Sequence, residues 1–89
     1  MNEARFVVRD VFDLAGREGL IAPGQLQSGT IEVGDSLREV ESGHSTRVVG
    51  IEFQSSPSLG DGSCTLVLER TDSFEIHPGS VLEAILESP

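Results

Sequence analysis

The sequence contains no lysine, tryptophan or tyrosine, and it has a single cysteine. One cysteine cannot form an intramolecular disulfide, and it cannot supply a zinc site built from several cysteines. No apolar run approaches the ~20 residues of a membrane-spanning helix, and the first residues lack the basic and apolar stretches of a secretory signal. We therefore expect a cytoplasmic protein without membrane association. Without lysine there is no G-x-x-x-x-G-K-[ST] phosphate loop, so we expect no nucleoside triphosphate hydrolysis.

Charge of one sign dominates the 89 residues, with 15 acidic side chains against 6 arginines and a net charge of -9. Nucleic-acid binders gain affinity from clustered lysine and arginine, which this sequence lacks in its linear order. The acidic surface favours solubility or a basic protein partner. RNA or ribosome binding is disfavoured by the charge, although scattered arginines can still converge on one face of the fold.

Glycine and proline punctuate the chain at short, regular intervals, with short apolar segments between them. This spacing predicts an all-β barrel or sandwich in one domain over 1–89. Six strands are predicted, over 6–14, 20–27, 36–41, 46–53, 63–70 and 81–86, with one turn of 3₁₀ helix at 72–75. A closed barrel is the preferred arrangement because it leaves no open strand edge to protect.

Alternation within the segments predicts which side chains enter the core. Phe6 and Val8 share a face, and the pattern then blurs over 10–12, as a β-bulge would make it. Pro23 predicts an edge position or a kink. Leu37 is the expected core contact of the third strand, and Cys64 belongs to the apolar face of the fifth.

The fourth strand is expected to bury Val49, Ile51 and Phe53, because these residues alternate with Gly50 and Glu52. The four phenylalanines are expected to supply most of the bulky core volume, since no other aromatic residue is present.

Three stretches, taken in order, resemble the second domain of elongation factor Tu and related translational GTPases. Residues 10–19 resemble "DVF-x-I-x-GRG", and glycines follow at every fifth position from Gly19 to Gly34, with Gly34-Asp35 at the family's "GD" turn. Residues 76–82 resemble "I-x-x-G-x-V-L". The resemblance covers about residues 6–86 and implies a closed six-stranded Greek-key β-barrel. The glycines are expected to have a folding role.

The resemblance also implies a function, that of a non-catalytic binding module standing alone without a GTPase domain. Docking on a protein partner is the preferred hypothesis, and weak binding of RNA or of the ribosome is the alternative. In the family this domain holds the acceptor end of aminoacyl-tRNA. Glu52 matches the glutamate of that pocket, whereas its arginine falls near Gln54 or Ser55 and its asparagine near Gly62 or Ser63. Arg17 lies at a predicted hairpin tip, and Arg17 and Glu52 are the candidate partner-binding residues.

No residue set predicts catalysis, a metal ion or a cofactor. Cys64 lies on an apolar face, where a thiol is inert, and His44 and His77 lie in turns without ligand spacing. Glu39 and Glu41 share one strand face, for which a solvated edge is the simpler account. We therefore expect that the protein is not an enzyme and has no catalytic, metal or cofactor site.

Overall fold

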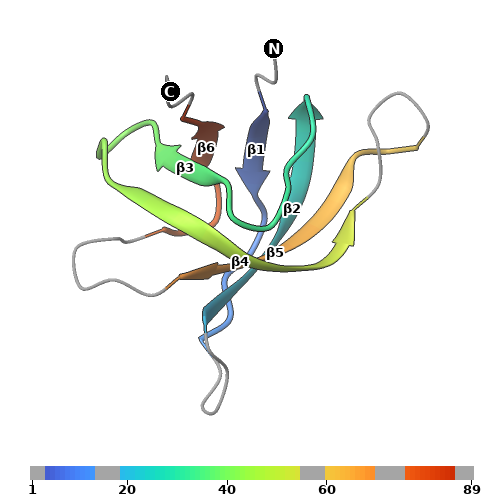
Figure 1. The fold of residues 1–89 in the computed structure, drawn as a ribbon, viewed down its shortest axis with the longest axis horizontal. Helices are drawn as coiled ribbons and strands as arrows, with labels where there is room; N and C mark the ends of the chain where they lie inside the picture. Colours follow the sequence, from blue (N-terminus) through green and yellow to red (C-terminus); the bar gives the residue numbers. More distant parts are fainter. Residues whose placement is uncertain (1–3, 14–18, 55–59, 70–75, 86–89) are drawn as a thin grey trace.

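The computed structural model describes residues 4–13, 19–54, 60–69 and 76–85, and these residues form an all-β structure (Figure 1). The predicted 3₁₀ turn at 72–75 and the candidate residue Arg17 lie outside them. The strands are β1 (Arg5–Val8), β2 (Gly19–Ser28), β3 (Ser36–Glu39), β4 (Ser45–Gln54), β5 (Ser63–Glu69) and β6 (Val81–Ala84). All six predicted strands are present. No described residue belongs to a helix, so none lies in a helix long and apolar enough to cross a membrane.

The six strands close into an antiparallel barrel in the order β1-β2-β5-β4-β3-β6. Strands β3, β4 and β5 are sequential neighbours, and β2 lies beside β5 rather than beside β3, which is the Greek-key arrangement. Strand β6 lies between β1 and β3 and closes the ring. The predicted closed barrel is therefore confirmed, and every strand has a hydrogen-bonded neighbour on both sides.

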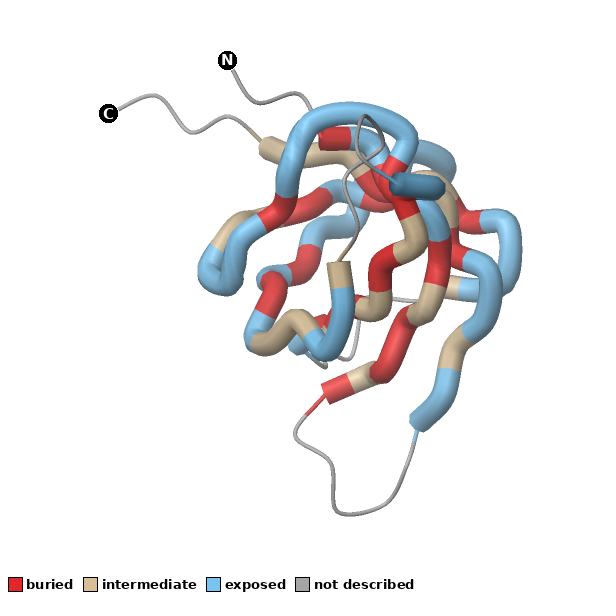
Figure 2. The backbone as a smooth tube through the Cα atoms, turned by 90° about the vertical axis from the view of Figure 1, so that its right-hand side faces the viewer, coloured by how far each residue is buried: buried red, intermediate tan, exposed pale blue. Residues whose placement is uncertain are grey.

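The core is mainly aliphatic. Buried red segments alternate with tan and pale blue ones along the strands, as expected when successive side chains point to opposite sides of a sheet (Figure 2). The buried cluster consists of Ala4, Phe6, Val8, Ala22, Leu26, Ile31, Leu37, Val48, Cys64, Leu66, Leu68 and Leu82. The predictions for Phe6, Val8, Leu37 and Cys64 are confirmed.

The expectation that phenylalanines fill the core is wrong for the residues that the structure describes. Phe6 is fully buried, whereas Phe12 and Phe53 are 45% and 58% exposed. Leucines supply the bulk instead, because β2, β3, β5 and β6 each point at least one leucine into the barrel.

A bulge follows β1, where the sequence pattern predicted one. The amides of Arg9 and Asp10 both donate to the carbonyl oxygen of Pro23, at 2.8 and 3.2 Å. Two residues thus oppose one, which is the definition of a β-bulge. Pro23 is not on an edge strand, because β2 pairs with β1 and β5. The ring nitrogen, which has no hydrogen to donate, is tolerated because it lies opposite this bulge.

Gly24 illustrates the folding role predicted for the glycines. A Cβ atom built at this position would collide with the carbonyl oxygen of Val7 and with the ring of Phe6. Strands β1 and β2 therefore approach as closely as they do because Gly24 has no side chain. This contact is what allows the Phe6 ring to fill the barrel beside β2.

The predicted face of β4 is wrong. Val48 is buried, whereas Val49 is 39% exposed and Phe53 is 58% exposed. The pairing of β4 with β5 shifts between Val48 and Gly50 and again between Ile51 and Phe53, so Val49 and Glu52 are extra residues in two bulges. Each extra residue reverses the alternation, and Ile51 alone of the predicted face packs partly against the core.

Glu39 does not lie on a solvated edge, because it is only 4% exposed. Strand β3 ends at this residue, and one carboxylate oxygen of Glu39 accepts the amide N–H of Ser42 at 2.8 Å. The chain reverses here, since Gly43 donates to the carbonyl oxygen of Glu39 and the amide of Glu39 donates to His44. Glu39 thus closes the β3–β4 turn, while Glu41 is exposed.

Candidate binding surface

Apolar side chains cover the outer side of the wall formed by β2, β5 and β4. We call this surface the outer apolar face and define it by Phe12, Ile21, Pro23, Val49, Phe53 and Val67. Three of its members, Phe12, Val49 and Phe53, are among the exposed large hydrophobic residues of the protein. Pro23 and Val67 are half-buried and Ile21 is 8% exposed, so the exposed apolar area lies mainly at Phe12, Val49 and Phe53. Apolar residues gathered on one face mark interaction sites more often than scattered ones do.

One row of this face runs across the wall from Phe12 to β4. Phe12 and Ile21 exchange two backbone hydrogen bonds, of 2.8 and 2.9 Å, so the two residues lie directly opposite each other. Ile21 pairs with Val67, and Val67 pairs with Gly50. Directly opposed residues point to the same side of a sheet, so Phe12, Ile21, Val67 and Gly50 share one side. The adjacent row, formed by Leu20, Leu68 and Val48, points into the barrel. The row that begins at Phe12 therefore faces outward.

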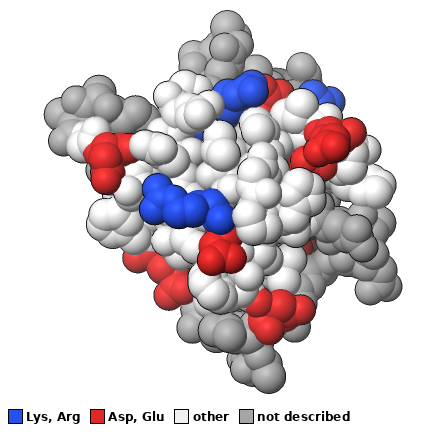
Figure 3. All heavy atoms as spheres, turned by 180° about the vertical axis from the view of Figure 1, so that it is seen from behind, with Lys and Arg blue, Asp and Glu red and all other residues white. Residues whose placement is uncertain are grey.

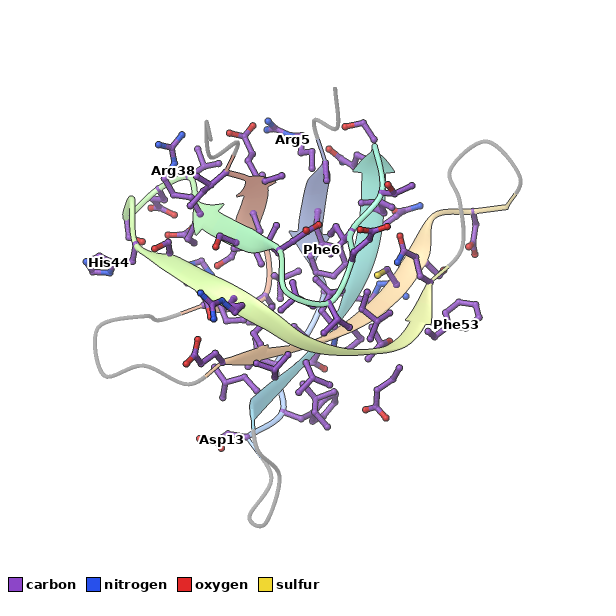
Figure 4. All side chains as sticks on the ribbon, viewed as in Figure 1. Arg5, Phe6, Asp13, Arg38, His44 and Phe53 are labelled. Atoms are coloured by element: carbon purple, nitrogen blue, oxygen red, sulfur yellow. The ribbon has the colours of Figure 1, made fainter. Side chains whose placement is uncertain are left out.

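The neighbouring row runs from β2 to Phe53. Pro23 pairs with Thr65, and Thr65 pairs with Phe53. The next inward row is Gly24–Cys64–Gln54, which places Pro23, Thr65 and Phe53 outside. In Figure 4, Phe6 lies inside the barrel, whereas Phe53 points away from it near the end of β4. The β4 bulge adds Val49 to the same outer side.

The rim of the outer apolar face is mainly acidic. Asp13 follows Phe12 in the chain, Glu52 precedes Phe53, and Glu69 lies two residues beyond Val67 on the outward side of β5; all three are exposed. Arg47, also exposed, lies on β4 at the end of the wall that carries Glu69. Arg9 and Asp10, which are also exposed, both donate their amides to the carbonyl oxygen of Pro23 and so border the face beside β1. Among the described residues, four carboxylates thus border the face with two arginines, and this part of the rim carries a net negative charge.

Glu52, a candidate from the sequence, is therefore exposed at the rim of this face. Gln54, which stands near the arginine position of the tRNA pocket, is committed to the fold. Its side-chain amide donates to the carbonyl oxygen of Ile31 at 2.9 Å and accepts from the Ile31 amide at 3.2 Å. Ser63 points outward beside Gln25, and its amide donates to the carboxylate of Asp61. Gln54 and Ser63, which stand near two positions of the tRNA pocket, thus have separate structural contacts, and Arg17 and Ser55 lie outside the described residues.

Groups with chemical reactivity do not converge within the described part of the chain. Cys64 is a buried free thiol, and burial raises its pKa to about 11. His44 and His77 are both exposed, and one ring nitrogen of His77 lies 3.0 Å from the carbonyl oxygen of Pro78. Residues 4–13, 19–54, 60–69 and 76–85 contain no group of three or more histidine, cysteine or acidic residues that could hold a metal ion.

Arginines of the described residues lie at separate places on the barrel (Figure 3). Arg5 forms an ion pair with Glu83 at 2.6 Å, and Arg38 lies opposite Glu83 on the other neighbouring strand. The view from behind shows arginine atoms in separate places, with acidic atoms near them (Figure 3). The convergence of arginines that could have favoured RNA is thus limited by Glu83, which lies between Arg5 and Arg38.

The sequence matches no known protein-family model. The likeness to the second domain of elongation factor Tu accordingly stays a prediction from the three sequence motifs. The outer apolar face was missed because the alternation was read without bulges. A signal was present, since consecutive valines at 48 and 49 cannot both face the core of a regular strand.

Proposed function

We propose that this protein is a non-catalytic binding module, related to the second domain of the translational GTPases, that docks on a protein partner through the outer apolar face. The observation that carries the proposal is the exposure of Phe12 and Phe53 on one wall, at 45% and 58%. Burying such side chains against a partner gains roughly 25 cal/mol for each Å² of apolar surface removed from water. The proposal assigns the protein no catalytic step and a cytoplasmic location.

The closed barrel limits how a partner can bind. An open sheet edge can accept an extra strand from a partner. Each strand of this barrel has a hydrogen-bonded neighbour on both sides, although β3 pairs with β4 only over Ser45–Arg47. Side chains on the outer walls therefore offer a larger surface for recognition than the strand edges do. Among those walls, the one formed by β2, β5 and β4 combines two exposed aromatic residues, and aromatic residues are enriched where proteins bind one another.

Weak RNA or ribosome binding is the second candidate, and the motif resemblance favours it. The phenylalanines of the outer apolar face could stack on bases, but the acidic rim opposes the phosphate backbone. Protein docking therefore has the stronger support.

The test compares proteins enriched from the source cells by three forms of the domain after nuclease treatment. The double variant Phe12→Ser/Phe53→Ser removes the aromatic groups of the outer apolar face. The control is Val40→Ser, because Val40 is 48% exposed and lies beside β6, away from that face. We expect the wild type and the control to enrich the same partner proteins, and the double variant to enrich none of them. Each such partner, once purified, should bind the wild-type domain directly. Equal enrichment by all three forms would contradict the proposal.

A further inference from the structure

We infer that the partner is a basic amphipathic segment of another protein, whose apolar residues cover the outer apolar face while its lysine or arginine side chains meet the acidic rim. The inference rests on the proposed function and adds the chemistry of the partner. It follows from how the charges are placed around the exposed aromatic residues.

The acidic groups stand at different sides of the face, so a ligand that covers the centre lies beside at least one of them. Asp13 adjoins Phe12 beyond β2, Glu52 adjoins Phe53 on β4, and Glu69 ends the central strand β5. The bulge between Ile51 and Phe53 inserts Glu52 directly next to Phe53. An apolar anchor placed over Phe53 would therefore bring neighbouring groups of the ligand close to a carboxylate, which favours cationic neighbours.

A second copy of this chain is a poorer occupant of the same face. A symmetric dimer places one surface against its own copy, so each acidic rim would face an identical acidic rim. Each chain also carries a net charge of -9, which adds a general repulsion between copies. With a basic partner, the interaction at the rim and the interaction between the net charges are both attractive.

The experiment uses two designed amphipathic peptides with the same leucine positions, one with lysine and one with glutamate on the polar face. Each is titrated into isotopically labelled protein, and amide chemical shifts identify the residues contacted. We expect the lysine peptide to shift the amides of Phe12, Val49 and Phe53, and the glutamate peptide to leave them in place. Raising the salt from about 0.05 M to about 0.3 M should weaken the lysine peptide roughly tenfold, because shorter Debye lengths screen the rim.

Charge variants separate the rim from the apolar centre. Glu52→Gln/Glu69→Gln should weaken the lysine peptide about fivefold or more and reduce its salt dependence. Glu41→Gln removes one charge, as each of the single variants Glu52→Gln and Glu69→Gln does, and it is their matched control because Glu41 is exposed in the turn after β3, on another side of the barrel. An equal loss in the control would show that the net charge, and not the rim, attracts the peptide, and this would overturn the inference.

Other outcomes distinguish the inference from the proposed function. Equal binding of both peptides at Phe12 and Phe53 would overturn the basic partner while leaving an apolar docking site. Shifts confined to other walls would overturn both. Concentration-dependent shifts at this face without peptide would identify a second copy as the occupant, and stronger binding of a single-stranded oligonucleotide there would identify RNA; either result overturns the inference.

Discussion

At the scale of single residues, the two phenylalanines Phe6 and Phe53 contrast sharply. Phe6 is fully enclosed, whereas Phe53 lies more than half exposed on the outside of β4. Truncation of a buried phenylalanine removes transfer energy and leaves a cavity. Truncation of an exposed phenylalanine loses less transfer energy and leaves no cavity in the core.

Phe6→Ala is therefore expected to lower the free energy of unfolding by roughly 3–5 kcal/mol, and Phe53→Ala by about 1 kcal/mol or less. Urea denaturation followed by far-UV circular dichroism measures both. A loss of 3 kcal/mol or more for Phe53→Ala would mean that this side chain belongs to the core and that the outer apolar face does not exist.

Cys64 offers a second residue-scale prediction. Its thiol is 1% exposed, and burial raises its pKa to about 11, so little thiolate is present at neutral pH. Because the thiolate is the reactive form, we expect the folded protein to react with a thiol reagent only as it unfolds. The rate should rise by orders of magnitude in denaturant. Rapid labelling of the native protein would contradict the burial of Cys64.

At the scale of secondary-structure elements, the approach of β1 to β2 depends on Gly24. An added methyl group would collide with the Val7 carbonyl and the Phe6 ring. We expect Gly24→Ala to cost at least about 2 kcal/mol, in the upper part of the range for overpacking. Gly50→Ala is the control, because a Cβ atom added at Gly50 would lie 3.4 Å from its nearest neighbour, the Cβ of Val67. This variant should change the free energy of unfolding by less than about 1 kcal/mol. Similar losses in the two variants would argue against the β1–β2 contact.

The β3–β4 turn predicts a dependence of stability on pH. A hydrogen bond from the Ser42 side chain, supported by the Ser42 amide, lowers the pKa of Glu39 below its ordinary value of 4.5, although burial opposes this. A lowered pKa in the folded state means that the carboxylate contributes stability above the ordinary value and loses it as the pH falls. Wild type should therefore lose more stability than Glu39→Gln between about pH 6 and pH 3. Parallel losses in urea titrations would show that Glu39 does not hold the turn.

Much of this element-scale structure could be predicted from the sequence, and the exceptions have two causes. Cys64, Leu66 and Leu68 alternate without interruption on β5, so their burial followed from the period of two. On β4 the same rule failed at Val49 and Phe53, because each bulge inserts an extra residue and reverses the alternation. The position of Glu39 could not be predicted either, since its burial depends on where the strand ends and the turn begins. The candidate surface was lost with these errors, because its most exposed members lie beside bulges.

At the scale of the whole molecule, the net charge and the placement of the arginines decide the affinity for RNA. Arg5 is already paired with Glu83, and the net charge of -9 opposes contact with a phosphate backbone. We expect binding of aminoacyl-tRNA no tighter than the ~10⁻⁴–10⁻⁶ M of non-specific contacts at physiological salt. A fluorescence titration measures this. Submicromolar affinity that Glu52→Ala abolishes would instead restore the acceptor-end function implied by the resemblance.

The position of β6 in the ring has a consequence for synthesis on the ribosome. Strand β6 follows the other five strands of the barrel in the sequence, yet it supplies a hydrogen-bonding neighbour of both β1 and β3. Until Val81–Ala84 has left the exit tunnel, these two earlier strands each lack one neighbour. At roughly 5–20 residues per second, the nascent chain waits several seconds with unpaired strand edges. The closure that protects the finished barrel from aggregation is thus delayed until the sixth strand has been made, and the nascent barrel is most vulnerable just before β6 emerges.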